Sequence, residues 1–192
     1  GHVVNRDPVM LVASAGLGLQ HVLTPAPAYA ATFSPGHPDS VGTTLSDSQV
    51  WWAGLPHVDV PPGGRAIWVL SEAYSRAVGQ HLYEKTAPSD LLVFGGSREI
   101  CDAVRIPPDR SLRRALGGTV TSLNVRSATQ WLTLADGKDP FAGSTRAKWH
   151  AWAEASLHEE VFNRRPMSDS AVLEFVEHLR AQQPQISKTT AL

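Results

Sequence analysis

A strand, a capped helix and a second strand follow one another between residues 66 and 94, and this order limits the fold more than any other feature. Residues 66–70 form a short apolar run, Ser71 is a typical helix N-cap, and residues 72–82 repeat apolar side chains at helical spacing. Residues 91–94 form another apolar run before Gly95 and Gly96. Such a unit returns to its sheet by a right-handed crossover, so it predicts a parallel sheet covered by helices.

The flanking segments predict how this unit is extended. We expect residues 8–13 to form a third buried parallel strand and residues 45–55 a helix. The second half predicts a short basic turn at 107–116 and helices beginning at 121, 144 and 168. The fold class is therefore α/β, a three-layer fold with a short, mainly parallel sheet and C-terminal helices. We expect an α/β domain at residues 1–135 and, packed on it, a helical extension at 136–192.

Composition excludes several classes of protein without assigning a function. Hydrophobic residues make up 42% of the chain and charged residues 18%, as in a globular protein rather than a disordered or fibrous one. The net charge of −1 gives no global basic field. Residues 1–100 carry 5 basic and 8 acidic side chains, and residues 101–192 carry 12 and 10. A surface for a polyanion is therefore expected in the second half.

The cysteine and histidine residues indicate the cellular compartment and limit which metals or cofactors the chain could bind. Cys101 is the only cysteine, so the chain has no internal disulfide, and we expect a cytoplasmic protein. The eight histidines show no zinc-binding spacing, and we expect neither metal nor cofactor. The apolar run near residues 9–23 contains Gly16, Gly18 and Gln20, so we interpret it as part of the fold rather than as a signal peptide, and no run is long enough for a membrane span. Both ends suggest that the chain is trimmed or completed by a partner.

Small or hydroxylated residues follow each of the three expected strands. They are Ser14 and Gly16, then Ser71, then Gly95 and Gly96. In an open parallel sheet the carboxyl ends of the strands line the ligand crevice, and glycine lets a ligand approach the backbone. The sequence therefore predicts a base- or nucleotide-binding site here, although these glycines are equally explained as turns at strand ends.

The segment 29–40 is dense in aromatic, hydroxyl, imidazole and carboxyl side chains. We expect Tyr29 and Phe33 to stack a base, with Thr32 beside them. His37 and Asp39 are the candidate catalytic residues, because they can hydrogen-bond a base or activate water. The alternative is an ordered loop in which Asp39 and the next residue cap the following helix.

A second cluster in the basic half has side chains suited to an anion. A Gly-Gly pair at residues 117–118 separates the arginines from a predicted helix start, where backbone N–H groups favour negative charge. The candidate phosphate-binding residues are Arg113, Arg114, Thr121, Ser122, Asn124 and Arg126. The alternative is a solvated basic turn followed by a capped helix.

The first part of the chain resembles a known bacterial superfamily. The segment Leu11-Val12-Ala13-Ser14-Ala15-Gly16-Leu17, followed after a gap by Pro27-Ala28-Tyr29-Ala30-Ala31-Thr32, is similar to the "S-A-x-x-G-L, gap, P-Y-x-x-T" signature of that superfamily. It includes the DUF6884-type proteins and, more distantly, the peroxide-stress YaaA proteins and a domain of archaeosine synthase. The likeness covers residues 9–130.

The resemblance implies a fold related to that of uracil-DNA glycosylases and a role in DNA modification or phage defence. It implies a pocket lined by six residues: Ser14, Gly16, Tyr29, Thr32, Ser71 and Tyr74. The chain departs from the superfamily in one respect, because it has no Cys-Ser…Lys motif before Val9. The activity that this motif carries would then be lost or supplied by a partner.

Three functions are therefore expected. The first is a DNA-binding or base-processing protein of a bacterial modification or defence system; as an enzyme it would be a glycosylase-like hydrolase acting on a flipped nucleotide. The second is a non-catalytic subunit of a larger assembly, formed with a protein partner or with further copies of the chain. The third is a sensor that binds a free nucleotide.

Overall fold

The computed structural model describes residues 8–59, 64–84, 86–158 and 167–183. They belong to two compact units, residues 1–158 and residues 159–192. The first contains every strand and the helices α1 to α5, and the second contains the helix α6 (Asp169–Gln182). The predicted last helix is therefore present, with Ser168 as its N-cap, whereas the part of the expected helical extension after residue 183 lies outside the described residues.

The central sheet has three parallel strands in the order β3-β4-β5. β3 (Ala66–Leu70) and β4 (Leu91–Gly95) pair along their whole length, and β5 (Arg105–Ile106) pairs with the end of β4. Between β3 and β4 the chain forms α2 (Glu72–Val78), which Ser71 caps by accepting a hydrogen bond from the Tyr74 N–H. The predicted strand–helix–strand unit is confirmed, and the helical segment ends as a 3₁₀ turn (Gly79–Leu82).

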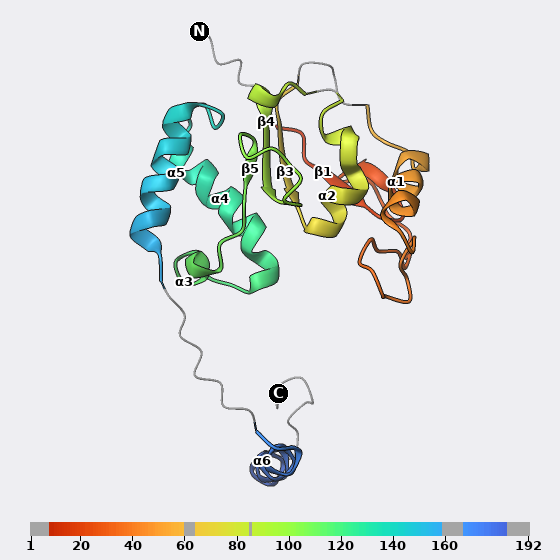
Figure 1. Cartoon of the computed structure of the whole chain (residues 1–192), viewed down its shortest axis with the longest axis vertical. Helices are drawn as coiled ribbons and strands as arrows, with labels where there is room; N and C mark the ends of the chain where they lie inside the picture. The colour runs from red at the N-terminus through yellow and green to blue at the C-terminus, as the bar shows by residue number, and fades with distance from the viewer. Residues whose placement is uncertain (1–7, 60–63, 85, 159–166, 184–192) are drawn as a thin grey trace. The chain divides into compact units, whose positions relative to one another are not determined.

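Two hydrophobic cores cover the two faces of this sheet, which gives the predicted three-layer α/β fold. Along β4, Leu91 and Val93 face one core and Leu92 and Phe94 face the other, as the two-residue period of a strand requires. The first core lies under α1 (Leu45–Gly54) and α2, and the second under α4 (Leu123–Ala135) and α5 (Gly143–Ser156). Figure 1 shows the two helical layers on opposite sides of the strands.

The expected first strand is not part of the parallel sheet. β1 (Leu11–Ser14) and β2 (Gly18–His21) form an antiparallel hairpin with its own two-stranded sheet. Alternate side chains of β1 face outward, so that Val12 is 46% exposed, and the expectation of a fully buried parallel strand is wrong. Gly18 allows the chain to reverse, because its φ is +77° and a Cβ there would overlap the Pro56 carbonyl. The third parallel strand is β5, which the sequence did not indicate.

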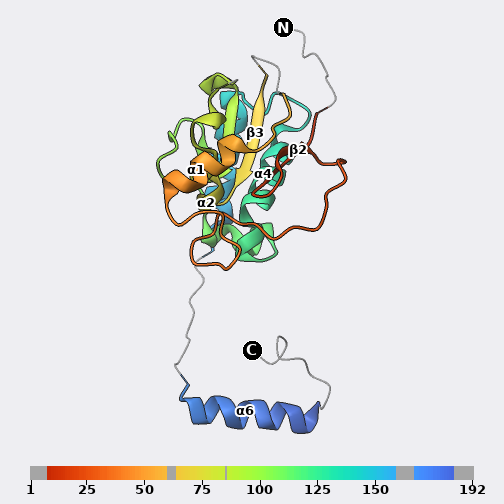
Figure 2. The ribbon, with the colours of Figure 1, turned by 90° about the vertical axis from the view of Figure 1, so that its right-hand side faces the viewer.

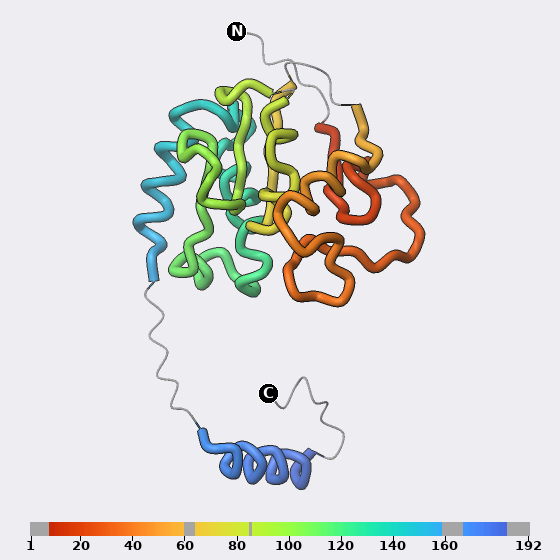
Figure 3. Tube along the Cα trace, turned by 45° about the vertical axis from the view of Figure 1, so that its right-hand side comes forward, coloured from red at the N-terminus to blue at the C-terminus, as the bar shows by residue number. Residues whose placement is uncertain are grey.

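A long irregular segment joins the hairpin to α1, and Figure 3 shows its path in red and orange. It includes an isolated bridge between Thr32 and Ser40, which closes a loop over residues 32–40. The N-cap of α1 is Thr44, in a capping box with Asp47, so the alternative in which Asp39 caps this helix is wrong.

The second half of the first unit is helical, as the sequence predicts. A 3₁₀ turn (Arg110–Leu112) leads into α3 (Arg113–Leu116), and a second 3₁₀ turn (Val120–Ser122) leads into α4. α4 crosses behind β3 in Figure 2, and it packs against β3 and β4. Trp131 and Trp149 contact Phe94 edge-on within the second core, so α5 belongs to the same compact unit as the sheet.

Candidate functional site

Tyr29 is fixed at its hydroxyl by the turn of the β1–β2 hairpin. Its Oη lies 2.5 Å from the Oγ of Ser14, the last residue of β1. The same Ser14 Oγ accepts hydrogen bonds from the backbone N–H groups of Gly16, at 3.3 Å, and Leu17, at 3.1 Å. The serine therefore ties the phenol to the backbone of a tight turn, in the manner of local side-chain to backbone motifs.

The ring of Tyr29 packs directly on the backbone of Gly16. A Cβ at Gly16 would lie 2.5 Å from Cδ2 and 2.8 Å from Cε2 of this ring, which is closer than real Cβ contacts. Glycine is thus required for the approach, although here the approaching group is a protein side chain. Because Tyr29 remains 49% exposed, the ring presents surface to solvent while it is held at two points.

Tyr74 joins Tyr29 from the first turn of α2. Burial raises the pKa of the Tyr74 phenol, and the nearby Tyr29 phenol raises it further, whereas a hydrogen bond from the Ala15 backbone lowers it. The two phenols and Ser14 thus lie in one neighbourhood, which we call the tyrosine–serine cluster (Ser14, Gly16, Tyr29 and Tyr74). The structure brings together these four of the six residues that the resemblance implies. Ser71 lies next to the cluster as the cap of α2.

Phe33 supports the cluster from within the core. Its side chain is only 4% exposed, and its ring meets Tyr74 edge-on at 5.0 Å and Trp52 at 6.2 Å between centroids. A ring buried in this way presents no face to a base, which corrects the expectation that Phe33 stacks one.

Thr32, His37 and Asp39 form the neck and tip of the loop 32–40. The Thr32 N–H donates to the Asp39 carbonyl at 2.9 Å, and the Thr32 carbonyl accepts from the Val41 N–H at 3.0 Å. At the tip, His37 Nδ1 accepts from the Asp39 N–H at 3.2 Å and lies 3.5 Å from its carboxylate. Both tip side chains are about half exposed, at 54% and 44%, so their polar atoms are open to solvent.

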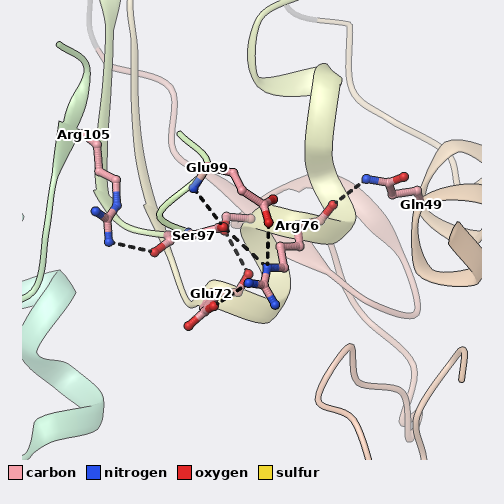
Figure 4. Close-up of polar contacts among 8 residues, drawn as sticks. Gln49, Glu72, Arg76, Ser97, Glu99 and Arg105 are labelled. Carbon is pink, nitrogen blue, oxygen red and sulfur yellow. Dashed lines mark hydrogen bonds and ion pairs between the residues drawn. The ribbon is translucent and has the colours of Figure 1, made fainter. Parts of the chain in front are cut away.

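Gly95 and Gly96, at the carboxyl end of β4, are already in contact with protein groups. The Leu70 carbonyl accepts from the Gly96 N–H and from the Asn124 side chain, both at 2.9 Å. A Cβ on Gly95 would overlap both the Asn124 amide and this carbonyl. Arg105 donates to the Gly95 and Gly96 carbonyls at 2.9 and 3.2 Å. Figure 4 shows the Arg105 side chain reaching the loop after β4. These contacts explain the glycines by packing, and they give Asn124 a structural partner in place of a phosphate.

Figure 4 also shows an ionic network that the sequence did not predict. Arg76 in α2 lies 2.9 Å from the Glu72 carboxylate and 3.7 Å from that of Glu99, and it donates to Ser97 Oγ at 3.4 Å. Ser97 is buried, and its N–H donates to Ser75 Oγ at 2.7 Å. The four-residue spacing of Glu72 and Arg76 is the one signal in the sequence that points to this network. It fixes α2 to the loop after β4.

The basic cluster is also held by internal contacts. Arg126 donates to the Leu116 carbonyl at 3.1 Å and lies over the backbone of Gly118, where a Cβ would overlap its guanidinium. Ser122 forms a capping box with Thr119, and Thr119 Oγ1 lies 2.8 Å from Thr121 Oγ1. The structure thus brings Arg126, Ser122 and Thr121 to the turn at 117–118, whereas Asn124 faces β3.

Arg114 makes a separate contact at the start of α3. Its Nη1 lies 2.8 Å from Nε2 of His158, close to the end of the first unit. Arg113 is half-buried beside it, while Arg114 is exposed. Of the predicted phosphate-binding arginines, Arg114 and Arg126 therefore keep exposed side chains.

Within the described ranges, no group of three or more His, Cys, Asp or Glu side chains is arranged to hold a metal ion. None of the helices described has both the length and the apolar character needed to cross a bilayer. Comparisons with protein-family models, with curated proteins and with solved structures gave no match.

Proposed function

We propose that this protein binds a nucleotide unit of DNA as part of a bacterial DNA-modification or defence system, with Tyr29 as the stacking surface. The observation that carries the proposal is the fixation of an exposed ring at both its hydroxyl and its face. Base–aromatic stacking contributes about 1–3 kcal/mol per base. A ring that is already immobilised loses little further entropy when a base stacks on it.

The position of the basic cluster supports a phosphate contact near the same edge of the sheet. Asn124, in the first turn of α4, reaches the Leu70 carbonyl at the carboxyl end of β3. Tyr74 lies in the first turn of α2, which begins directly after the same strand. Arg126, two residues after Asn124 in α4, is exposed and lies at the turn 117–118, where it supplies the cation that we propose for a phosphate.

The proposal extends to hydrolysis only through His37 and Asp39. Their mutual contact and their half-exposed side chains suit a pair that positions water, with the imidazole beside the carboxylate. Asp39→Asn is expected to abolish base excision from DNA while it preserves DNA binding. Unchanged excision in this variant would remove Asp39 from the catalytic assignment.

Fluorescence anisotropy with labelled single- and double-stranded DNA, measured across a salt series, tests the binding proposal. The affinity should fall linearly with the logarithm of the salt concentration, because phosphate contacts release counterions. Tyr29→Ala should weaken binding by roughly 10-fold, in line with one lost stacking contact. Phe175→Ala is a matched control, because Phe175 is equally exposed at 50% but lies in the other compact unit. No binding at low salt, or equal losses in both variants, would refute the proposal.

A second candidate function, a non-catalytic subunit of an assembly, is favoured by α6. The apolar side chains of this helix recur at helical spacing: Val172, Phe175, Val176 and Leu179. Among the described residues of its own compact unit there is no second helix or strand for this stripe to pack on, and an isolated helix of 14 residues is marginally stable in water. We therefore expect this stripe to pack on a second copy of the chain. Light scattering across a concentration series tests this candidate. If wild type and Phe175→Glu both keep the mass of a monomer at every concentration, the candidate is excluded.

A further inference from the structure

The Ser14 hydroxyl has only one hydrogen to donate, and its surroundings determine where that hydrogen goes. Its oxygen accepts from the N–H groups of Gly16 and Leu17, which occupy both lone pairs of the oxygen. The remaining contact is the 2.5 Å approach to Tyr29 Oη. Because two oxygens this close must share a hydrogen and Ser14 can accept no further bond, Ser14 is the donor and Tyr29 is the acceptor.

This assignment leaves the Tyr29 hydroxyl with its own hydrogen. A phenol O–H lies near the plane of its ring, so the hydrogen points away from the side on which Ser14 donates. Among the described residues, no side chain or backbone carbonyl accepts it. The half-exposed Tyr29 therefore offers a hydrogen-bond donor in a fixed direction, beside the ring surface proposed for stacking.

We propose that the Ser14 turn makes Tyr29 an obligate donor, so that this site selects ligands with an acceptor oxygen at this position. The inference rests on the proposed function, since it takes the ligand to be a nucleotide unit. A base that presents a keto oxygen satisfies the donor, whereas a base that presents an amino group in the same place puts two donors against each other. A phosphoryl oxygen offers the same chemistry as a keto oxygen.

Isothermal titration with matched nucleosides tests the inference. Inosine and adenosine differ in a keto oxygen against an amino group at one ring position, and uridine and cytidine differ in the same way. We expect the keto member of each pair to bind roughly 3–10-fold more tightly, which is the value of one net hydrogen bond to a half-exposed group. Inorganic phosphate is titrated separately and as a competitor, and competition by phosphate would place the acceptor on a phosphoryl oxygen instead of a base.

Two variants separate the donor from the stacking ring. Tyr29→Phe keeps the ring and removes the O–H, so it should reduce the keto preference to about 1-fold, through weaker binding of inosine and uridine and relief of the donor–donor conflict with adenosine and cytidine. Ser14→Ala frees the phenol to rotate and should reduce the preference in part. Tyr83→Phe is the control, because Tyr83 is a half-buried tyrosine of the same core outside the cluster, and it should keep the full preference.

The outcomes distinguish this inference from the proposed function. If Tyr29→Ala loses binding but the members of each nucleoside pair bind wild type equally and phosphate does not compete, the fixed-donor inference is overturned and stacking on Tyr29 stands. A preference that survives Tyr29→Phe also overturns it. If wild type binds none of the nucleosides, no phosphate and no DNA, the inference and the proposed function both fail.

Discussion

Replacing Gly95 by alanine distinguishes the two explanations of the glycines at the end of β4. If these glycines admit a ligand, as the sequence suggested, Gly95→Ala should impair binding in a protein that remains stable. The structure instead shows that a Cβ at this position would overlap the Asn124 amide and the Leu70 carbonyl. We therefore expect the substitution to reduce the free energy of unfolding.

Two costs determine the size of the effect. Gly95 has a φ of +83°, and a residue with a Cβ pays about 1–2 kcal/mol for this left-handed conformation. The Cβ also displaces the Asn124 amide from the Leu70 carbonyl, which it binds at 2.9 Å, at a cost of roughly 1–3 kcal/mol for a partly buried group left without its partner. The total is about 2–5 kcal/mol. For a chain of this size it corresponds to a melting temperature lower by roughly 5–15 °C.

Chemical unfolding followed by tryptophan fluorescence measures this loss, because all six tryptophans lie between residues 51 and 152, within the first compact unit. Gly137→Ala is the matched control. Gly137 has a similar φ of +69°, but a Cβ there meets nothing within 4 Å. The difference between the two variants therefore isolates the cost of the overlaps with the Asn124 amide and the Leu70 carbonyl, while the conformational strain and the change in the unfolded chain cancel.

A double variant sharpens the attribution. Asn124→Ala removes the amide that a Cβ on Gly95 would overlap, so the two substitutions together should cost less than their sum, by roughly 0.5–3 kcal/mol. Equal destabilisation by Gly95→Ala and Gly137→Ala, with strict additivity in the double variant, would refute the packing explanation. Lost ligand binding in a fully stable Gly95→Ala protein would favour the ligand explanation instead.

Three further predictions follow from individual contacts. Burial raises the pKa of Tyr74 above its usual 10.0, so the stability that its neutral phenol contributes is present below pH 10 and is lost as the pH rises further. In Tyr74→Phe the free energy of unfolding should therefore depend less on pH above pH 10. The same pH dependence in wild type and variant would contradict this prediction. The capping hydrogen bond with Thr44 lowers the pKa of Asp47, so the stability that its carboxylate contributes should be lost when the pH falls through that pKa. In chemical unfolding, Asp47→Asn should therefore be less sensitive to acid than wild type. Trp131→Phe replaces a buried indole by a smaller ring and removes the 2.8 Å hydrogen bond from its Nε1–H to the Pro140 carbonyl. It should lower the free energy of unfolding in urea by about 2–3 kcal/mol, and a loss below about 1 kcal/mol would contradict this packing.

The central unit of the fold was predictable because local signals agreed there. Ser71 caps α2 as expected, and the runs before and after the helix pair in parallel as β3 and β4. The hairpin was misassigned because an apolar run of this length fits a buried parallel strand as well as an alternating one. The tight turn at Gly18 decides between them, and its close approach to Pro56 is a tertiary contact that a short sequence window does not contain. β5 has only two residues, too few for a periodic signal.

The sequence predicted that some of the candidate residues lie close together, but it did not predict which protein groups they contact. Ser14, Tyr29 and Tyr74 come together as the resemblance implied. The burial of Phe33 was not predictable, because aromatic residues in a loop have the same sequence signature whether they face solvent or the core. Asn124 was assigned to phosphate from its place at a helix start, whereas its partner, Leu70, is 54 residues away in the sequence.

These differences move the proposed site within the fold. In an open parallel sheet the ligand is expected over the carboxyl ends of the strands, where glycines expose the backbone. Here the glycines of β4 are covered by Asn124 and Arg105, so backbone atoms at that point already have protein partners. The exposed ring and the directed hydroxyl lie instead on the hairpin side, where Gly16 and Ser14 hold Tyr29. A ligand of this protein should therefore depend more on the hairpin turn than on the sheet, and substitutions at Ser14 should alter selectivity while those at Gly95 alter stability.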